Sequence, residues 1–380
     1  MALRHPIYDA DSELIRDQIR RFIASEIEPY GEAWEEEGAF PRELYRKAGD
    51  AGLLGLGFEE EYGGSGGGLL YYCLAREEFA ASGFSGVRVG LMAHGIGLPP
   101  ILKLGSEALR QEIAPAVLAG DKIICLAISE PDAGSDVASI RTTARRDGDS
   151  YIVNGAKCFI SNGVRADYMT VAVRTGGPGM AGVSLLVIPG DAPGVSRTAM
   201  KKVGWWTSDT AEIAFADVRV PAANLLGAEN AGFRGIMNNF NLERLGIAAS
   251  LIGISRCAYD ETVRYAHERK TFGKALAEHQ VVRHKLVDMR AGIEALQAMM
   301  DTLIWRVQQG EACIAEIAML KAFGGEIQEK VAAEAAQIFG GAGMIRGHKV
   351  ERIFRESKIL SIGGGSAEVM KDLASRQLGW

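Results

Sequence analysis

The spacing of apolar residues changes twice along the chain. Over about the first 120 residues, apolar positions recur every three or four residues, which is the period of an amphipathic helix. From Lys122 to about Leu225 they alternate with polar residues, and Gly/Pro turns interrupt the runs, as is typical of strands. From Gly227 the helical period returns and continues to the end. The pattern therefore predicts helices, then a sheet, then helices again.

The first region is predicted to hold several helices. The clearest covers 11–37, where an Asp-Ser-Glu cap precedes an apolar stripe and the opposite face is charged. A Gly-rich stretch at 55–68 has no preceding strand and no third glycine in register for a dinucleotide-binding loop, so we expect an ordinary loop there. The remaining helices are expected over 41–53, 69–82, 88–103 and 107–118.

The middle region is predicted to form a β-barrel or sandwich. Its apolar runs are short, alternate with polar residues and are separated by turns at 176–179 and 189–194. The strands are expected over 123–128, 141–144, 149–155, 169–173, 183–189 and 211–218.

The last region is predicted to form a four-helix bundle. A single helix over 231–268 is followed by helices over 276–309, 312–339 and 366–378, broken by Gly-rich turns. The expected fold class is therefore α+β with three domains: a helical domain over 1–120, a β domain over 121–226 and a helical bundle over 227–380.

Composition limits the classes of function. At 380 residues the chain is too long for one compact core, and 47% hydrophobic with 24% charged residues is ordinary for a soluble protein. The net charge of −6 gives no reason to expect a nucleic-acid partner. No apolar run reaches membrane-spanning length, and residues 1–11 resemble neither an export signal nor an organelle leader. We therefore expect a cytoplasmic protein that does not insert into membranes.

Cysteine and histidine spacing argues against disulfides and metals. The five cysteines lie far apart with no CxxC pair, which fits a reducing compartment. The six histidines form no HExxH motif. Neither a disulfide framework nor a metal site is expected.

Residues 128–136, Ile-Ser-Glu-Pro-Asp-Ala-Gly-Ser-Asp, have the properties of an anion-binding loop. Gly134 allows backbone N–H groups to approach a phosphate closely, while Ser129 and Ser135 add hydroxyl donors. Taken alone, such a run is most often an ordinary turn.

A second motif at 158–163, Cys-Phe-Ile-Ser-Asn-Gly, supplies complementary chemistry. Phe159 offers a flat apolar wall and Ser161 a small donor close to it. A phosphate-binding loop beside an aromatic wall is the combination that a flavin dinucleotide needs.

A carboxylate interrupts the apolar face of the long predicted helix. Glu243 lies on the same helical face as four apolar residues, and no Lys or Arg lies on that stripe to neutralise it. A lone Glu on a helix is usually a solvated surface residue. Burial in an apolar stripe would instead raise its pKa and make it a stronger base. The stripe consists of Ile236, Phe240, Glu243, Ile247 and Leu251.

The two motifs together resemble those of the acyl-CoA dehydrogenase family. The shared pattern is Ser-Glu-Pro-x-Ala-Gly-Ser-Asp followed by Asn-Gly-x-Lys-x-Phe-Ile-Ser-Asn-Gly, and the order of helices and sheet agrees over nearly the whole chain. The resemblance implies an FAD cofactor and dehydrogenation of an acyl-CoA to a trans-2-enoyl-CoA. It places the flavin ring and pyrophosphate against Ile128, Ser129, Gly134, Ser135, Phe159 and Ser161.

The resemblance also implies the catalytic residues. Family members take their base either from a Glu on the last Gly-rich turn or from a Glu in the middle of the long helix. The turn here reads Gly-Gly-Gly-Ser at 363–366, without the Glu, so Glu243 is expected to be the base, as in isovaleryl-CoA and long-chain members. The backbone N–H of Gly364 is expected to stabilise the thioester oxygen, to which a ribityl hydroxyl of FAD also donates.

Further FAD contacts are implied at a second location. In the family they reach the cofactor of a neighbouring subunit, so the expected assembly is a homotetramer formed as a dimer of dimers. Helix C-caps are the alternative interpretation of the glycine pairs. The residues are Arg269, Thr271, Phe272, Gln337, Gly340 and Gly341, with Ser366 and Glu368 on the last turn.

The acyl-CoA site is implied in less detail. Glycines at 363 and 364 replace a Tyr and a Glu, which is expected to open space for a longer or branched acyl chain. Arg244 matches an arginine near the CoA, with an ion pair to a neighbour such as Glu243 as the alternative. The implied substrate residues are Met92, Ser135, Phe240, Asn241, Arg244 and Gly363.

Electron-transfer flavoprotein is the implied electron acceptor. The alternative is a monooxygenase or oxidase of the same fold acting on a substrate without CoA. Glu243 and the intact set of FAD motifs favour the dehydrogenase.

Overall fold

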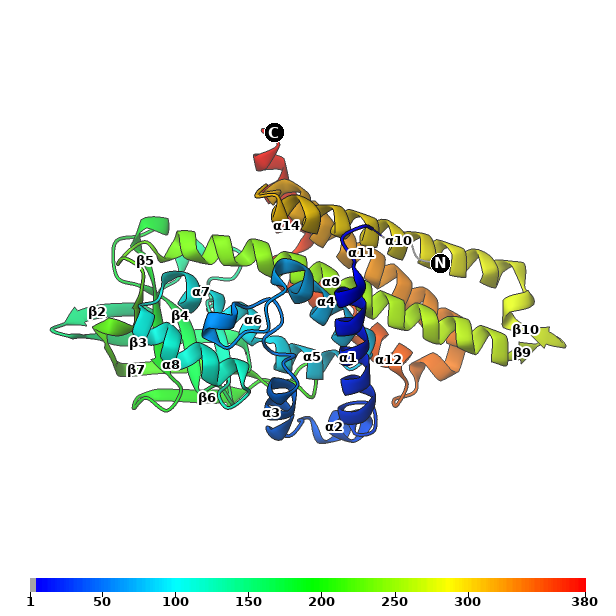
Figure 1. Ribbon diagram of the computed structural model, residues 1–380, viewed down its shortest axis with the longest axis horizontal. Helices are drawn as coiled ribbons and strands as arrows, with labels where there is room; N and C mark the ends of the chain where they lie inside the picture. The colour runs from blue at the N-terminus through cyan, green and yellow to red at the C-terminus, as the bar shows by residue number, and fades with distance from the viewer. Residues whose placement is uncertain (1–4) are drawn as a thin grey trace.

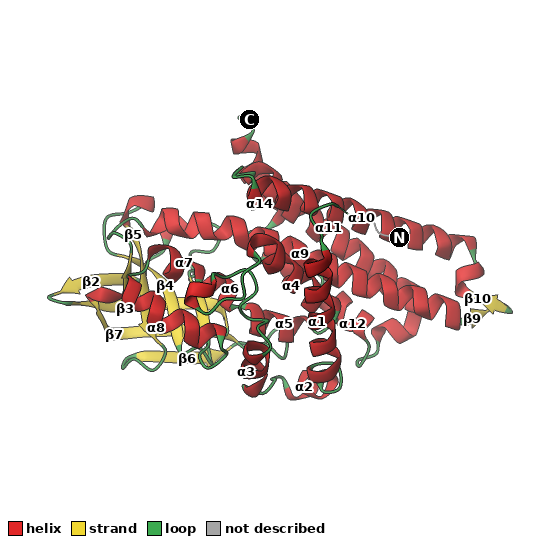
Figure 2. Cartoon of the chain, in the orientation of Figure 1, coloured by secondary structure: helices red, strands yellow, loops and turns green. Residues whose placement is uncertain are grey.

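The computed structural model describes residues 5–380 and has three parts along its long axis (Figure 1). A β-sheet lies at one end, a helical bundle forms the other, and the N-terminal helices pack beside both. Figure 2 shows that the strands gather at one end, apart from a small hairpin at the far tip. The α+β class predicted from the sequence is confirmed. Residues 1–4, which belong to the predicted first domain and to the stretch 1–11 compared with leader sequences, lie outside the described residues.

The N-terminal part contains more and shorter helices than the apolar spacing predicted. The predicted helix 11–37 is two helices, because Pro29 disfavours helical backbone in the residue before it and the chain turns there. The predicted helix 88–103 is three, because two glycines and the Pro99-Pro100 pair interrupt it. The observed helices are α1 Ala10–Glu26, α2 Gly31–Glu37, α3 Glu43–Asp50, α4 Gly68–Ala81, α5 Ser85–Met92, α6 His94–Gly97, α7 Pro99–Leu104 and α8 Glu107–Leu118.

The middle part is a single connected sheet. Its pairing order is β6-β7-β3-β2-β4-β5-β8, with β1 parallel to β4. The second motif belongs to the same strand as the predicted segment 149–155, and β6 was not predicted because it is a largely exposed strand with only one apolar side chain facing inward. The strands are β1 Ile124–Ala127, β2 Thr143–Asp147, β3 Ser150–Ser161, β4 Tyr168–Arg174, β5 Val183–Pro189, β6 Val195–Ala199, β7 Thr210–Pro221 and β8 Leu225–Leu226.

The C-terminal part is built around the 37-residue helix α9, Gly232–Glu268, which runs from the sheet into the bundle (Figure 1). Helix α12 was not predicted because only its Val350 and Ile353 are buried apolar residues. No helix within residues 5–380 is long and apolar enough to cross a membrane. The other elements are β9 Lys270–Thr271, β10 Lys274–Ala275, α10 Gln280–Gln308, α11 Ile314–Phe339, α12 Lys349–Glu356, α13 Ile359–Ile362 and α14 Ala367–Gln377.

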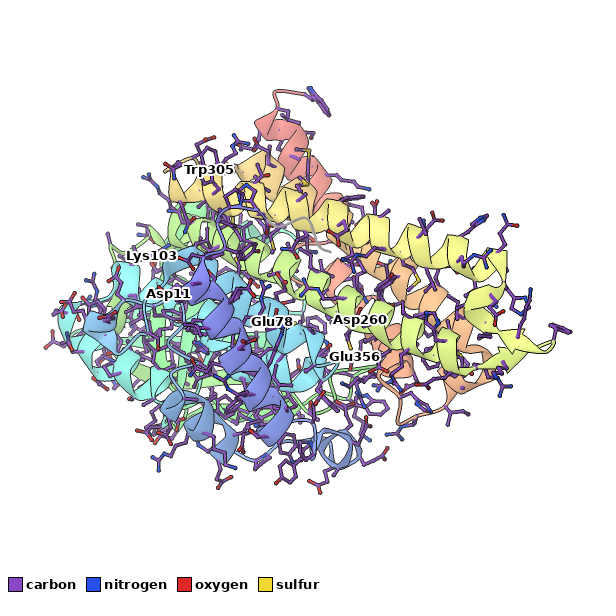
Figure 3. All side chains as sticks on the ribbon, turned by 45° about the vertical axis from the view of Figure 1, so that its right-hand side comes forward. Asp11, Glu78, Lys103, Asp260, Trp305 and Glu356 are labelled. Carbon is purple, nitrogen blue, oxygen red and sulfur yellow. The ribbon has the colours of Figure 1, made fainter. Side chains whose placement is uncertain are left out.

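Helix α9 is held close against α4. A Cβ on Gly253 would lie 2.1 Å from the carbonyl oxygen of Glu77, so only glycine permits this approach. Buried Glu78, labelled in Figure 3, receives Arg16 and Arg20 from α1, and Arg256 of α9 is 3.6 Å from the same carboxylate. These charges join three helices around one carboxylate.

The two sequence motifs are joined by a buried ion pair. Lys157 Nζ lies 2.7 Å from Glu130 Oε1 and also donates to the carbonyl of Ile128 at 2.9 Å. The same carboxylate accepts from the backbone N–H groups of Arg141 and Thr142 at 2.6 and 3.0 Å. Burial lowers the pKa of Lys157 to about 8, although Glu130 opposes the shift. This pair fixes the loop that follows β1 onto β3.

Replacing Lys157 with Met is expected to destabilise the β-sheet region. The change leaves the Glu130 carboxylate buried without its cation, which should cost about 3–5 kcal/mol. The midpoint of urea unfolding, followed by intrinsic fluorescence, measures the loss. Lys371→Met is the control, because its pair with Glu326 is exposed and should contribute less than about 1 kcal/mol. Equal midpoints for the two variants would show that the buried pair does not stabilise the fold.

Candidate active site

The loop after β1 is open toward the surface. Glu130 and Ala133 exchange backbone hydrogen bonds of 2.9 and 3.1 Å, which closes a tight turn, and Cys158 N–H donates to the carbonyl of Ser129 at 2.9 Å. Gly134 and Ser135 are exposed, and a Cβ on Gly134 would meet nothing within 4 Å. The predicted anion-binding loop therefore has free space in front of its N–H and hydroxyl donors.

The side chain of Phe159 points toward solvent beside this loop. Its φ is +60°, a left-handed conformation that is costly for an aromatic residue, and its side chain is 68% exposed. A register shift in the β3–β7 pairing falls between Lys157 and Ile160, so a bulge turns the ring out of the sheet. An exposed aromatic ring held in a strained conformation next to an anion-binding loop fits a planar cofactor with a phosphate tail.

The end of β3 is held from the N-terminal helices. Asn162, also at positive φ (+59°), is buried; it donates to Gly90 O at 2.8 Å and lies 3.2 Å from the Tyr45 hydroxyl. Ser161, between Phe159 and this anchor, is half-buried. The sequence motif included Asn162 but gave no sign of its role in fixing the strand end.

Glu243 and the last Gly-rich turn lie together, although 120 residues separate them. A Cβ built on Gly364 would lie 3.8 Å from Glu243 Oε1 and 2.2 Å from Ile247 Cδ1. Ile247 therefore occupies the room that the sequence led us to expect beside Gly364, and this part of the expectation of extra space is wrong. Gly364 itself has φ +69°, a conformation that favours glycine.

Glu243 is half-buried, and the loss of hydration that this causes raises its pKa to about 7. Three positive charges oppose the shift: Arg244 on the same helix, Arg76 on α4 and Lys321 on α11. The apolar stripe of α9 itself carries no cation, as its spacing predicted, but Arg244 beside the stripe supplies one and neighbouring elements supply two. Among the described residues none of the three forms an ion pair with Glu243, so each acts on the carboxylate only through its charge at a distance.

The side chain of Arg244 contacts residues of its own helix, α9. Its Nη1 donates to Asn241 Oδ1 at 3.1 Å, and its guanidinium carbon lies 5.7 Å from the centre of the half-buried Phe240 ring. Its Nε is buried without a partner in the described chain. The ion pair with Glu243 that we considered as an alternative is not formed, and the three predicted substrate residues of α9 form one contiguous group.

Lys321 was not identified from the sequence. Its buried Nζ donates to the carbonyls of Ser361, at 3.2 Å, and Gly365, which fixes both sides of the Gly-rich turn. Burial lowers its pKa to about 8. A single Lys inside the apolar run Ala-Met-Leu-Lys-Ala-Phe at 318–323 is the signal that could have pointed to it.

Met92, the predicted floor of the acyl site, is buried at the end of α5. Its carbonyl accepts from Arg76 Nη2 at 3.3 Å. Gly363 is half-buried on the turn beside Glu243. Arg76 is a second residue of this region that sequence reasoning missed.

The second group of predicted cofactor residues lies at the opposite end of the molecule. The β9–β10 hairpin lies at the far tip of the bundle, away from the sheet that carries Phe159 (Figure 1). Phe272 is 97% exposed there. The stacked rings of Tyr265 and Phe339, 4.1 Å apart, bring the ends of α9 and α11 together. The exposed residues Arg269, Phe272, Gln337, Gly340 and Gly341 and the half-buried Thr271 are thus grouped at this end.

The two remaining predicted contacts flank the start of α14. Ser366 caps the helix through a 3.4 Å hydrogen bond from Val369 N–H, and Glu368 is exposed in its first turn. They lie near the Gly-rich turn but are not joined to the hairpin group by any described contact. Within one chain, the predicted cofactor residues therefore form separate groups.

Comparison with known proteins gives the family of the chain. Three family models cover the chain in order: acyl-CoA dehydrogenase N-terminal domain over residues 9–121, middle domain over 125–218 and C-terminal domain over 230–379. The long-chain specific acyl-CoA dehydrogenase of rat mitochondria is 35% identical over 376 residues, covering 98% of this chain and 87% of the relative.

Solved structures agree with the sequence relatives. A probable acyl-CoA dehydrogenase from Mycobacterium abscessus is 45% identical with a TM-score of 0.96, covering 98% of this chain and 99% of that one. A chain in the structure of the electron transferring flavoprotein of Acidaminococcus fermentans is 33% identical with a TM-score of 0.95 and full coverage of both chains. The chain therefore belongs to the acyl-CoA dehydrogenase family, oxidoreductases that act on the CH–CH bond of acyl-CoA thioesters with FAD as cofactor.

Proposed function

We propose that this enzyme converts an acyl-CoA to a trans-2-enoyl-CoA with Glu243 as the base that removes the α-proton. The observation that carries the proposal is the position of Glu243 Oε1, 3.8 Å from where a side chain at position 364 would begin. The helix thus delivers a carboxylate to the turn on which the resemblance places the alternative base. A pKa near 7 suits a base that works near neutral pH.

Gly364 is the proposed donor to the thioester oxygen. Negative charge develops on that oxygen as the α-proton leaves, and a backbone N–H held in place stabilises it without reorganisation. Lys321 keeps the donor in position by binding the carbonyls on both sides of the turn. Glu243 accepts the proton, and the bound FAD supplies the two-electron acceptor that takes the β-hydrogen as hydride.

The cofactor site is proposed to be completed by a second copy of the chain. Phe159 lies on β3 and the loop over 128–136 follows β1, both in the sheet at one end of the molecule, whereas Arg269 directly precedes the β9–β10 hairpin at the far tip (Figure 1). One FAD cannot contact both groups within one chain. A homodimer in which each hairpin reaches the partner's cofactor satisfies both, and pairing of two dimers gives the closed tetramer expected from the resemblance.

Electron-transfer flavoprotein is the proposed acceptor of the electrons. The likeness to a chain from an electron transferring flavoprotein structure supports this choice. A cytoplasmic location is also proposed, and five buried cysteines that are all free fit a reducing compartment.

The rate of flavin reduction is expected to depend on pH through the Glu243 carboxylate. With a pKa of about 7, only about a tenth of the base is ionised at pH 6, so the rate should fall about tenfold per pH unit below that. Anaerobic stopped-flow measurement of flavin bleaching by an acyl-CoA between pH 5.5 and 8.5 tests this. A rate that does not change across that range contradicts an ionising base at this site.

Glu243→Gln is expected to keep the fold, FAD and acyl-CoA binding, because the amide has the shape of the carboxylate and needs no charge. Flavin reduction should fall by about a thousandfold, since a positioned base is lost. Glu261→Gln on the same helix, where Glu261 pairs with Arg264, is the control and should bleach at the rate of the unmodified enzyme. If Glu243→Gln bleaches as fast as the control in one anaerobic turnover, the base lies elsewhere.

Arg269→Ala is expected to weaken FAD retention without unfolding the chain. Loss of a charge-assisted contact to the pyrophosphate should cost about 2 kcal/mol, or about thirtyfold in cofactor affinity. Flavin fluorescence released on dilution measures the change, with the exposed Arg264→Ala as control. Light scattering coupled to size exclusion gives the assembly. A monomer that still binds FAD tightly, or equal retention in both variants, would contradict the shared site.

A further inference from the structure

Arg76 is a buried cation beside the proposed base. It is 6% exposed, its guanidinium carbon lies 3.6 Å from the centre of the Tyr72 ring, and Nη1 and Nη2 donate only to the carbonyls of Tyr72 (3.4 Å) and Met92 (3.3 Å). A Cβ on Gly246 would lie 2.6 Å from its Cδ, so α9 presses directly on this side chain. The Arg76 side chain therefore fits against α9 only because position 246 is a glycine.

Arg88, on α5, is a second buried cation close to the first. It is 7% exposed, and its only described hydrogen bond runs from Nη1 to Ser250 Oγ at 3.1 Å. Its Nε and Nη2 are buried without a partner in the described chain. Its guanidinium carbon is 5.8 Å from the Trp205 ring centre. Burial, reinforced by the charge of Arg76, lowers the pKa of Arg88 to about 9.

Neither arginine has a carboxylate partner in the described chain. The nearby acids Glu77 and Glu78 are already paired with Arg256. Two like charges buried side by side oppose folding, because each loses hydration and gains no counter-ion. Such an arrangement persists when a function requires it.

Glu356, labelled in Figure 3, is the acid whose charge acts on Arg88. It accepts from the backbone N–H of Trp205 at 2.6 Å, and its second oxygen has no partner in the described chain. Burial and the charge of Glu35 raise the pKa of Glu356 to about 7, so near neutral pH it is only partly charged. Because it is not hydrogen-bonded to Arg88, the donors of Arg88 stay available.

Both arginines contact the face of α9 that carries the base. Gly246, against Arg76, is three residues beyond Glu243, and Ser250, against Arg88, is seven residues beyond it. At 1.5 Å per residue these contacts lie about 4.5 and 10.5 Å further along the helix. Arg76 also binds the carbonyl of Met92, the predicted floor of the acyl site. The two cations therefore lie further along the α9 face that carries Glu243, and Arg76 also contacts the predicted floor of the acyl site.

We propose that the acyl chain of the substrate ends in a carboxylate, so that the enzyme takes ω-carboxyacyl-CoA thioesters. The distal carboxylate would receive the free Nε and Nη2 donors of Arg88 and the charge of Arg76, and it would supply the counter-ion that both lack. The group takes no part in the reaction, which remains removal of one proton and one hydride at the α and β carbons. The inference rests on the proposed function, because it names the substrate class of that same site.

The test compares matched pairs of thioesters on the FAD-loaded enzyme. Adipyl-, suberyl- and sebacyl-CoA are each measured against hexanoyl-, octanoyl- and decanoyl-CoA by the apparent second-order rate constant of anaerobic flavin bleaching. At least one ω-carboxy thioester is expected to exceed its unsubstituted counterpart by at least about tenfold, because the plain chain leaves the arginines unpaired.

Substitutions of the two arginines test whether they cause the preference for ω-carboxy thioesters. Arg88→Gln is expected to reduce the preference for the ω-carboxy thioester at least about tenfold, and Arg76→Gln should act in the same direction. Arg264→Gln, exposed on α9, should change neither the rates nor the preference. A spectral titration of the oxidised flavin of the Glu243→Gln variant, which should bleach too slowly to interfere, gives the binding constant of each thioester and should show the same preference.

The outcomes separate this inference from the proposed function. If unsubstituted acyl-CoAs bleach the flavin and ω-carboxy thioesters bleach it no faster, the inferred preference for a distal carboxylate is wrong. The proposed dehydrogenase activity is still supported in that case. If no thioester of either kind bleaches the flavin, the proposed function itself fails. A preference that survives Arg88→Gln and Arg76→Gln also overturns the assignment. The preference of the unmodified enzyme decides the matter even if a variant does not fold.

Discussion

The length and straight course of α9 constrain everything else in the molecule. The helix begins beside the sheet, carries Glu243 in its first third and ends at Arg269. Those two residues are 26 positions apart, which corresponds to about 39 Å along the axis. A rigid helix of this length cannot bring its end back to the flavin wall at Phe159. The separation of the two predicted groups of cofactor residues within one chain is therefore a property of the helix.

Burial of charge sets the chemistry near the middle of that helix. Desolvation alone would push the pKa of Glu243 upward until the base remained protonated. Arg244, Arg76 and Lys321 oppose this at a distance, without the close ion pair that would make the carboxylate a poor base. The three cations thus keep the pKa of Glu243 near 7. The cost is that Arg244 Nε is buried without a partner in the described chain.

The sequence predicted those features of the fold that depend on interactions between residues close together in the chain. Apolar periodicity was sufficient for α9 and for the order of helices, sheet and helices, because burial of one face dominates there. It failed where backbone restrictions override periodicity, as at Pro29 and at the Pro99-Pro100 pair, and where few apolar residues mark an element, as in α12. Contacts between distant segments were invisible. Lys321 binding the turn at 361–365 and Arg76 facing Glu243 follow from packing that no local pattern encodes.

The geometry of the Gly-rich turn favours a carboxylate on the helix over one on the turn. Gly364 adopts a left-handed backbone in which a side chain is strained, and Ile247 Cδ1 occupies the place where its Cβ would be. A carboxylate on the turn would have to displace Ile247, which belongs to the same α9 face as Glu243. Lys321 holds the carbonyls of Ser361 and Gly365, so the turn cannot shift to make room. The helix face opposite the turn is the place where a carboxylate fits without strain, and Glu243 occupies it.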